Sequence, residues 1–178
     1  MSLASPDCRA DWEAYLAERR GTYDYRCNRY RAVWDECVTL GVADGDLVYD
    51  LGAGMCEFGR YIYSQRNWTG RYVPVDGAID GTNLEAYRLP TEPHIAVAIE
   101  VVEHLHTWRS FLDQLQGYTT RGAVITTPNP EAVDVRGMDR THVSPIERHQ
   151  LLIRGWRVKT VSLFGTPDDT LIGIYEQP

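Results

Sequence analysis

Short runs of apolar residues alternate along the chain with longer segments in which apolar residues recur every three or four positions. The short runs are typical of buried strands, and the periodic segments are typical of amphipathic helices. We therefore predict strands at residues 47–51, 71–75, 95–99, 123–126, 158–164 and 170–175. The periodic segments predict helices at residues 5–21, 28–40, 57–65, 107–115 and 145–154, the last of them started by a capping box from Ser144 to Glu147.

The order of these elements indicates the fold class. The run at residues 95–99 is apolar throughout, which is typical of a central parallel strand covered on both faces. Strands alternate with helices, and the last two strands are separated by a turn-forming segment whose acidic residues, Asp168 and Asp169, we expect to face solvent. The sequence therefore predicts an α/β domain: a three-layer, doubly wound, mostly parallel sheet that ends in an antiparallel hairpin.

Length, charge and cysteine content restrict the class of protein further. The 178 residues suffice for one domain with a buried core, and the formal net charge of −7 disfavours binding of nucleic acid through its phosphates. The four cysteines include no pair at Cys-x-x-Cys spacing, so neither a zinc knuckle nor a disulfide frame is indicated. The sequence shows neither a membrane-spanning run nor a signal-peptide run. We expect a cytoplasmic protein, monomeric or homodimeric, with no membrane or nucleic-acid partner.

The first predicted strand ends in a glycine turn that suits a ligand-binding loop. Gly52 and Gly54 allow a tight turn and a close approach of a ligand to the backbone. A dinucleotide-binding turn would place Gly or Ala where Glu57 stands, and the carboxylates of Asp50 and Glu57 would repel a diphosphate. They suit a ligand that carries an ammonium and a sulfonium, so NAD is disfavoured. Asp76, which ends the next strand, can accept hydrogen bonds from both hydroxyls of a ribose.

Four segments of the chain, taken in order, resemble the successive motifs of class I S-adenosylmethionine-dependent methyltransferases. They are Asp50-Leu51-Gly52-Ala53-Gly54, Asp76, Ala98-Ile99-Glu100-Val101-Val102-Glu103-His104-Leu105 and Thr126-Thr127-Pro128-Asn129. The resemblance covers residues 45–176 and implies that S-adenosylmethionine is the cofactor. We expect methyl transfer to oxygen or nitrogen of a small-molecule acceptor, such as a metabolite, a glycan or a natural-product intermediate.

The resemblance also implies which residues hold the cofactor. The glycine turn would lie against the methionine part of the cofactor, with Asp50 near its amino group. Asp76 would hold the ribose. The residues after the strand at 95–99 would line the cofactor, and the loop at 83–84 would contact adenine. The expected cofactor-binding set is Asp50, Gly52, Ala53, Gly54, Asp76, Gly77, Asn83, Leu84, Glu100 and Val101.

Two features depart from the pattern of this family. Asn83 stands where Asp is most often expected, although its side-chain amide can still pair with a base edge. Leu89 follows Asp76 by only 13 positions, which leaves little room for the helix and third strand that normally fill this crossover. We therefore expect a shortened crossover after the second strand. These departures also motivate an alternative, a non-catalytic member of the fold that binds the cofactor or a protein partner.

The segment that precedes the glycine turn is rich in aromatic residues. We expect residues 1–44 to form an N-terminal helical lid or cap, and residues 45–178 to form the cofactor-binding core of a single domain. Such segments often cover the methyl donor in this family, which would give Tyr23 and Tyr25 a role in shaping the acceptor pocket. Most of the other aromatic residues, Tyr30 and Trp34 among them, are expected to pack the helices on the sheet.

Methyl transfer places few demands on catalytic side chains, because the sulfonium is already a good leaving group. Positioning and exclusion of water supply much of the acceleration, and a base is needed only when the acceptor holds its proton tightly. His104 and His142 follow predicted strands at the edge where substrate should enter. We predict that they are catalytic bases or orient the acceptor, with Glu103 as a partner. The alternative is that both histidines have a structural role and only form hydrogen bonds within their loops.

The same residues allow a second interpretation, which involves a metal ion. Glu100, Glu103, His104 and His142 resemble the four metal ligands of the small-RNA 3′-terminal 2′-O-methyltransferases, in which a divalent cation holds the terminal ribose hydroxyls. Such a mixture of carboxylate and imidazole suits Mg²⁺ or Mn²⁺. The pattern also occurs in methyltransferases of small molecules, and the acidic net charge opposes an RNA substrate. We therefore predict no metal ligands and keep this activity as the alternative.

Overall fold

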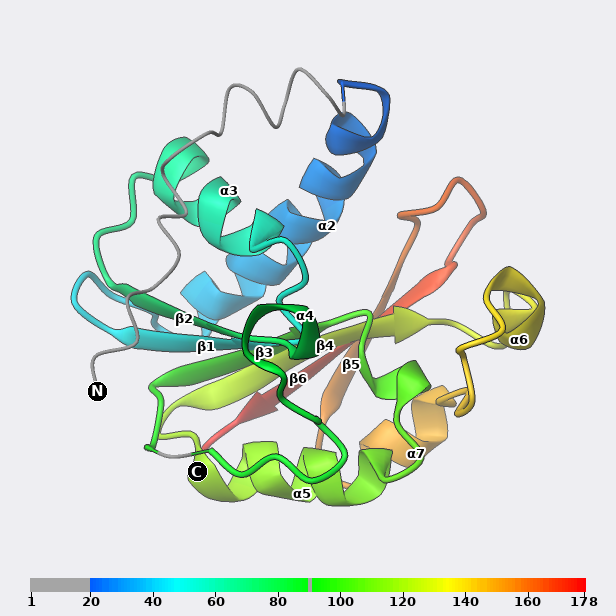
Figure 1. Ribbon diagram of the computed structural model, residues 1–178. Helices are drawn as coiled ribbons and strands as arrows, with labels where there is room; N and C mark the ends of the chain where they lie inside the picture. The colour runs from blue at the N-terminus through cyan, green and yellow to red at the C-terminus, as the bar shows by residue number, and fades with distance from the viewer. Residues whose placement is uncertain (1–19, 90) are drawn as a thin grey trace.

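The computed structural model describes residues 20–89 and 91–178, which form a six-stranded sheet between two layers of helices (Figure 1). The strand order is β2-β1-β3-β4-β6-β5. In chain order the strands are β1 (Leu47–Leu51), β2 (Arg71–Val75), β3 (Ile95–Ile99), β4 (Gly122–Pro128), β5 (Arg157–Val161) and β6 (Thr170–Glu176). All six strands lie where the apolar runs predict them.

The first four strands pair with one another in parallel, and the last two form the predicted antiparallel hairpin. The hairpin joins the sheet through β6, which pairs antiparallel with β4 along seven residues. Strands β1 and β3 lie between β2 and β4, so the carboxyl ends of these four parallel strands are adjacent. The predicted fold class, a doubly wound and mostly parallel sheet that ends in a hairpin, is confirmed.

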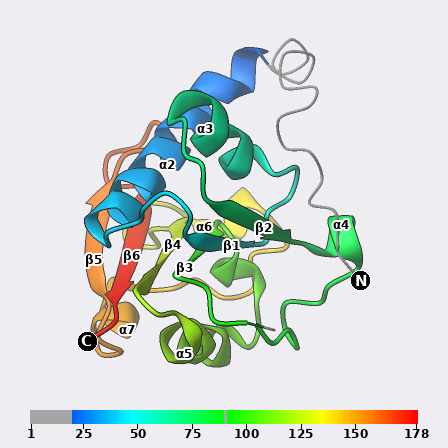
Figure 2. The same cartoon turned by 90° about the vertical axis from the view of Figure 1, so that its left-hand side faces the viewer.

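Helices cover both faces of the sheet. Helices α2 (Arg20–Thr39) and α3 (Glu57–Gln65) lie on one face, and α5 (Trp108–Tyr118) and α7 (Arg148–Leu152) lie on the other (Figure 1). Figure 2 shows the same separation from the side. Three short elements, α4 (Gly77–Asp80), η1 (Val102–His104) and α6 (Val135–Met138), lie in the connections. Among residues 20–89 and 91–178, no helix combines the length and apolarity that a membrane crossing requires.

Successive residues of the strands point to opposite faces of the sheet and so supply two separate cores. In β1, Val48 packs with the residues of α2 and α3, whereas Tyr49 packs with those of α5. The first core contains Tyr30 and Trp34 of α2, as the sequence predicts. Both cores include residues of the central strands, so these strands are packed on both faces of the sheet.

The crossover after β2 is shortened, as predicted. Between Val75 and Ile95, apart from position 90, the structure contains the short helix α4 and no strand, so β2 forms one edge of the sheet. Glu85 anchors this segment, because its carboxylate accepts hydrogen bonds from the backbone N–H groups of His106 (2.6 Å) and Thr107 (2.9 Å) at the start of α5. Gln114 of α5 holds the same segment, since it accepts a hydrogen bond from the backbone N–H of Leu89 (3.0 Å) and donates one to the carbonyl of Tyr87 (2.9 Å). Side chains at both ends of this contact thus anchor a crossover that lacks a strand of its own.

Two predicted helix boundaries are wrong. Helix α2 already includes Arg20 and runs through Gly21, where the sequence predicts an end. The capping box of α7 is formed by Glu147 and Gln150, three residues later than the predicted box at Ser144. Ser144 instead donates its backbone N–H to the carbonyl of Glu103 (2.9 Å), which draws this segment toward η1.

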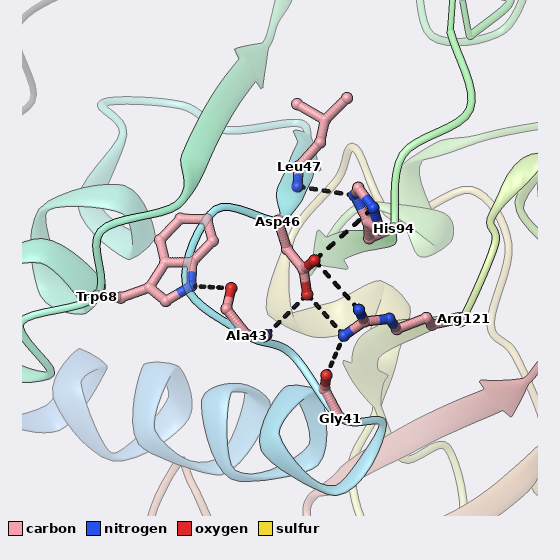
Figure 3. A network of polar contacts seen from close by, with 7 residues as sticks. All are labelled: Gly41, Ala43, Asp46, Leu47, Trp68, His94 and Arg121. Atoms are coloured by element: carbon pink, nitrogen blue, oxygen red, sulfur yellow. Dashed lines mark hydrogen bonds and ion pairs between the residues drawn. The ribbon is translucent and has the colours of Figure 1, made fainter.

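A polar network closes the amino-terminal edge of the sheet (Figure 3). The buried carboxylate of Asp46 accepts hydrogen bonds from the backbone of Ala43 (2.7 Å) and from both terminal nitrogens of Arg121 (2.7 and 3.2 Å). His94 accepts a hydrogen bond from the backbone of Leu47 through Nδ1 (2.9 Å) and places Nε2 3.7 Å from Asp46. The network joins the residues that precede β1, β3 and β4, so it positions these strands from the end opposite to the glycine turn.

We expect Asp46→Ala to lower the free energy of unfolding by about 2–3 kcal/mol, because it leaves Arg121 and the Ala43 N–H without their buried acceptor. Urea unfolding followed by circular dichroism measures the change. Asp113→Ala is the control, since it removes a carboxylate that is 61% exposed from the ion pair with Arg154, and its cost should stay below about 1 kcal/mol. Equal costs for the two variants would contradict a structural role for the Asp46 network.

Candidate functional site

The turn after β1 brings the backbone against two neighbouring segments. Gly52 has a φ of 81° and donates its N–H to the carbonyl of Val75 at the end of β2 (2.8 Å). A Cβ at this position would lie 2.3 Å from Cγ2 of Val101. Gly54 also has a positive φ, of 51°, and a Cβ there would meet no described atom within 4 Å. The turn is therefore tight on its inner side at Gly52 and open on its outer side at Gly54.

Asp76 closes this turn from the neighbouring strand. Its Oδ2 accepts a hydrogen bond from the backbone N–H of Gly54 (2.9 Å), and the side chain is half-buried. The carboxylate that ends β2 thus lies directly beside the glycine turn that ends β1, as expected for two strands that pair in parallel. Gly77, the next residue, begins α4 and is exposed.

A cavity of about 230 Å³ lies in front of the glycine turn. Four of the predicted cofactor-binding residues line it, namely Asp50, Gly52, Ala53 and Gly54. The other lining residues are Arg26, Arg29, Tyr30, Met55, Glu57, Phe58 and Ile99. The three residues from α2 lie at positions i, i+3 and i+4, which share one face of a helix. In the sequence, three arginines are clustered within residues 26–31. Only the helical register shows that Arg26 and Arg29 face the cavity.

Asp50 is a buried carboxyl at the floor of the cavity. It is 2% exposed, and its Oδ2 accepts a hydrogen bond from the hydroxyl of Tyr72 (2.5 Å). Burial raises the pKa of Asp50 to about 7; the Tyr72 hydrogen bond opposes this shift, and the charge of Asp76 adds to it. A cation bound beside Asp50 would therefore favour its ionised form and would be held by it.

Glu57 joins α2 to the start of α3. Its carboxylate accepts hydrogen bonds from Arg26 (2.8 Å) and from the hydroxyl of Tyr30, and the side chain is buried. Burial raises the pKa of Glu57 to about 6, and the charge of Arg60 opposes this shift. Through these contacts, α2 is fixed against the glycine turn and forms a wall of the cavity.

Two further carboxyl groups lie after β3. Glu100 has a φ of 55° and accepts a hydrogen bond from the hydroxyl of Thr126 (2.8 Å); burial raises its pKa, and Arg29 and Thr126 oppose the shift. Glu103 is fully buried, and neither of its carboxylate oxygens has a hydrogen-bond partner within the described residues. Burial and the neighbouring charge of Glu100 raise the pKa of Glu103 well above its usual range. Its neutral form is therefore favoured, and the approach of a cation would favour the ionised form.

His104 and His142 lie side by side next to Glu103. Their ring centroids are 4.7 Å apart, and the two imidazoles and the Glu103 carboxylate each place a potential ligand atom within 4.8 Å of the others. Nδ1 of His142 contacts the carbonyl of Val135 (2.7 Å), and Nδ1 of His104 contacts the hydroxyl of Thr141 (2.9 Å). Burial, followed by the charge of His142, lowers the pKa of His104, so its neutral form is favoured. The predicted catalytic residues thus form one cluster.

The other predicted site residues are not among those that line the cavity; they are Asp76, Gly77, Asn83, Leu84, Glu100, Val101, Glu103, His104 and His142. Asn83 is exposed, and its side-chain oxygen accepts a hydrogen bond from the backbone N–H of Glu85 (3.0 Å) within its own loop. Leu84 packs against the core on the α5 side. Val101 is buried directly behind Gly52. The side chains of Tyr23 and Tyr25, predicted to shape the acceptor pocket, lie outside the described residues.

The prediction that Asp169 faces solvent is wrong. Asp168 is exposed, but Asp169 is fully buried and accepts hydrogen bonds from the backbone N–H groups of Leu163 (2.7 Å), Phe164 (2.6 Å) and Thr166 (3.0 Å). One carboxylate therefore organises the whole hairpin loop between β5 and β6. This organisation fixes the position of Phe164, whose ring lies 4.5 Å from the guanidinium of Arg29 at the cavity.

No model of a known protein family matches the sequence, and no curated protein matches it significantly. Similar solved structures do exist. A chain in the complex between the Haloferax volcanii Trm112 methyltransferase activator and a methyltransferase has a TM-score of 0.63 and 14% identity, and the match covers 96% of this chain and 97% of that chain. The plantazolicin methyltransferase BpumL, in complex with a substrate analogue and S-adenosylhomocysteine, has a TM-score of 0.60 and 12% identity, with 97% and 91% of the chains covered.

Magnesium protoporphyrin IX methyltransferase from Synechocystis, with bound S-adenosylhomocysteine, has a TM-score of 0.56 and 12% identity, and the match covers 86% of this chain and 84% of that chain. At these identities the comparison shows a shared fold. The chain thus has the fold of class I S-adenosylmethionine-dependent methyltransferases, which confirms the fold that the motifs imply.

We expect Asp50 to make the protein less stable as the pH rises from about 4 to about 7. In the unfolded chain its carboxyl ionises near pH 4, whereas in the folded protein it keeps the proton up to a pKa of about 7. Unfolding therefore releases a proton in this range, so the free energy of unfolding falls with rising pH and levels off above about 7.

Asp50→Asn keeps the shape of the side chain and should lose the part of this slope that Asp50 contributes, so the slope becomes shallower. Glu57, Glu100 and Glu103, whose pKa values burial also raises, keep their own contributions. Urea unfolding at several pH values between about 4 and 8 measures the slope. Asp44→Asn changes an exposed carboxylate and serves as the control, which should keep the wild-type slope. If Asp50→Asn has the same pH dependence as the wild type, the buried carboxyl is not the cause.

Proposed function

We propose that this protein transfers a methyl group from S-adenosylmethionine to oxygen or nitrogen of a small-molecule acceptor. The observation that carries this proposal is the pairing of the glycine turn with Asp76 beside a cavity, at the carboxyl ends of adjacent parallel strands of a methyltransferase fold. In open α/β sheets, ligands bind at this edge.

The residues at the site fit this cofactor. Gly54 leaves open space on the outer side of the turn, and Asp50 offers a buried carboxyl toward the ammonium and sulfonium groups. Asp76 is placed to accept the hydroxyls of the ribose, next to the backbone of Gly54. When bound, the cofactor supplies a methyl group on a positively charged sulfur.

The contribution of the protein to the reaction is positioning and the removal of one proton. Burial keeps His104 neutral, and its contact with Thr141 through Nδ1 directs Nε2 away from that loop. Nε2 can then accept the proton of an acceptor hydroxyl or amine as the new bond forms. His142 can serve in the same way, since its Nδ1 is held by the carbonyl of Val135. Glu103 lies beside both rings and can stabilise a protonated imidazole.

The N-terminal segment supports the proposal through α2, which lines the cavity with Arg26, Arg29 and Tyr30. We propose that residues 1–44 act as the lid of the site and residues 45–178 as its core. A small acceptor agrees with two of the similar structures, whose names assign them magnesium protoporphyrin IX and plantazolicin. The net charge of −7 disfavours a polyanionic acceptor.

Isothermal titration calorimetry with S-adenosylhomocysteine tests this proposal. We expect the wild type to bind and Asp76→Ala to lose roughly 10-fold or more of its affinity, because the ribose hydroxyls lose a charged acceptor. Asp113→Ala, which removes a carboxylate far from the turn in sequence and exposed to solvent, should bind as the wild type does. Absence of binding by the folded wild-type protein would rule out the proposed cofactor.

A second candidate is a metal-dependent version of the same reaction, and one specific observation favours it. Glu103, His104 and His142 bring potential ligand atoms within 4.8 Å, and both oxygens of Glu103 lack a partner among the described residues. The Nδ1 contacts of the two imidazoles leave each Nε2 for a cation. The fourth residue of the predicted set, Glu100, is hydrogen-bonded to Thr126 and is not part of this group. A cation here would hold hydroxyl groups of the acceptor, such as the terminal ribose of an RNA.

Calorimetric titration with MnCl₂ separates the two candidates. If the cluster is a metal site, the wild type binds Mn²⁺ and Glu103→Gln binds it at least about 10-fold more weakly, since a charged oxygen ligand is lost. Glu147→Gln, an exposed carboxylate next to His149, is the matched control and should keep the wild-type affinity. If Mn²⁺ does not bind, and a chelator leaves methyl transfer unchanged, the histidines act as bases without a metal.

A further inference from the structure

Arg29 places a cationic group in the wall of the cavity, where no described residue forms a hydrogen bond or an ion pair with it. The side chain comes from α2 and lines the cavity together with Ile99 and the glycine turn. Its Nε is buried and has no hydrogen-bond partner, and its terminal nitrogens form no hydrogen bond or ion pair with any described residue. A buried charged donor without a partner is costly, so such a group in a cavity wall indicates a ligand that supplies the missing acceptor.

The guanidinium of Arg29 is nevertheless held in place. It lies over the ring of Phe164, 4.5 Å from the ring centroid, and the backbone N–H of Phe164 is fixed by Asp169 (2.6 Å). Stacking on an aromatic face leaves the edge of the guanidinium, where all of its N–H groups point, available to a planar partner. The hairpin loop therefore acts as a support that orients Arg29 in advance.

The carboxylates around the cavity have other partners. Asp50 is bonded to Tyr72, and Glu100 is bonded to Thr126. Glu57 is bonded to Arg26 and Tyr30. Glu100 lies close enough for Arg29 to oppose the rise in its pKa, but it forms no ion pair with Arg29. Within the described part of the chain, the positive charge of Arg29 is thus balanced only at a distance, and no oxygen atom is hydrogen-bonded to its guanidinium.

We propose that Arg29 binds the carboxylate of a ligand in this cavity through a two-pronged pair of hydrogen bonds. A planar carboxylate matches the fork of an arginine, and two parallel bonds give both affinity and orientation. A phosphate fits this wall less well, because Asp50 and Glu57 would repel its additional charge. Two ligands can supply this carboxylate: the methionine part of the cofactor, or the methyl acceptor. Both of these sources rest on the proposed function.

The first arm of the test compares S-adenosylmethionine with decarboxylated S-adenosylmethionine, which lacks only the carboxylate. Calorimetry gives both affinities for the wild type, Arg29→Gln and Arg31→Gln. If the cofactor supplies the carboxylate, the wild type prefers S-adenosylmethionine by roughly 10-fold or more, and Arg29→Gln loses this preference while its affinity for the decarboxylated compound stays within about twofold. Arg31→Gln, at an exposed position of the same helix, should behave as the wild type.

The second arm uses acetate, added to protein alone and to protein saturated with S-adenosylhomocysteine, and follows the Nε–H resonance of Arg29 by NMR. A saturable shift with the cofactor product bound, without a preference in the first arm, assigns the carboxylate to the acceptor. The resonance is identified by its loss in Arg29→Gln. Arg29→Lys keeps the charge but loses the fork, so it should recover only part of the binding.

The outcomes separate this inference from the proposed function. If neither form of S-adenosylmethionine binds the wild type, the proposed cofactor is wrong, and the shift with acetate on protein alone still decides the role of Arg29. If the first arm shows no preference and acetate shifts no Arg29 resonance in either state, the carboxylate site is refuted. Thermal unfolding of Arg29→Gln within about 2 °C of the wild type ensures that a loss of binding reflects the missing fork.

Discussion

The close approach of Gly52 to Val101 is the constraint on which the site depends. A Cβ at position 52 would lie 2.3 Å from Val101, and the φ of 81° disfavours any side chain there. Only a glycine lets the chain leave β1, bond to the end of β2 through Val75 and still pass over the residues that follow β3. Three strand ends thereby meet at one point. The cavity, the position of Asp76 and the placement of Glu100 all follow from that meeting.

Several carboxyl groups lie close together at the site, although burial alone would disfavour their ionised forms. Each is compensated in a different way: Asp50 by a tyrosine hydroxyl, Glu57 by an arginine and a tyrosine, and Glu100 by a threonine. Glu103 has no such partner among the described residues, and burial raises its pKa, which favours the neutral form. The arrangement is suited to a cationic ligand, because the approach of a positive charge would shift these groups toward ionisation and would be favoured in return.

The sequence predicts the sheet well, because strand identity depends on short apolar runs and on burial, which are local signals. It also predicts the shortened crossover, because 13 positions leave little room for both a helix and a strand. The roles of Asp169 and Glu147 are missed for a different reason. Asp169 is buried by a loop that folds around its own carboxylate, and Glu147 caps a helix in competition with Ser144. Both outcomes depend on the tertiary position of the backbone, which a local pattern does not contain.

The glycine-turn side of the cavity can be predicted from the sequence, whereas the opposite wall cannot. The glycine turn and Asp76 lie on adjacent strands, and their spacing is fixed by the register of the sheet. The opposite wall brings together Arg29, from a helix before β1, and Phe164, from the hairpin loop near the C-terminus. These two residues are 135 positions apart, so their contact exists only once both ends of the chain have packed on the sheet. Because this wall is assembled from distant parts of the chain, its residues can change without disturbing the glycine turn.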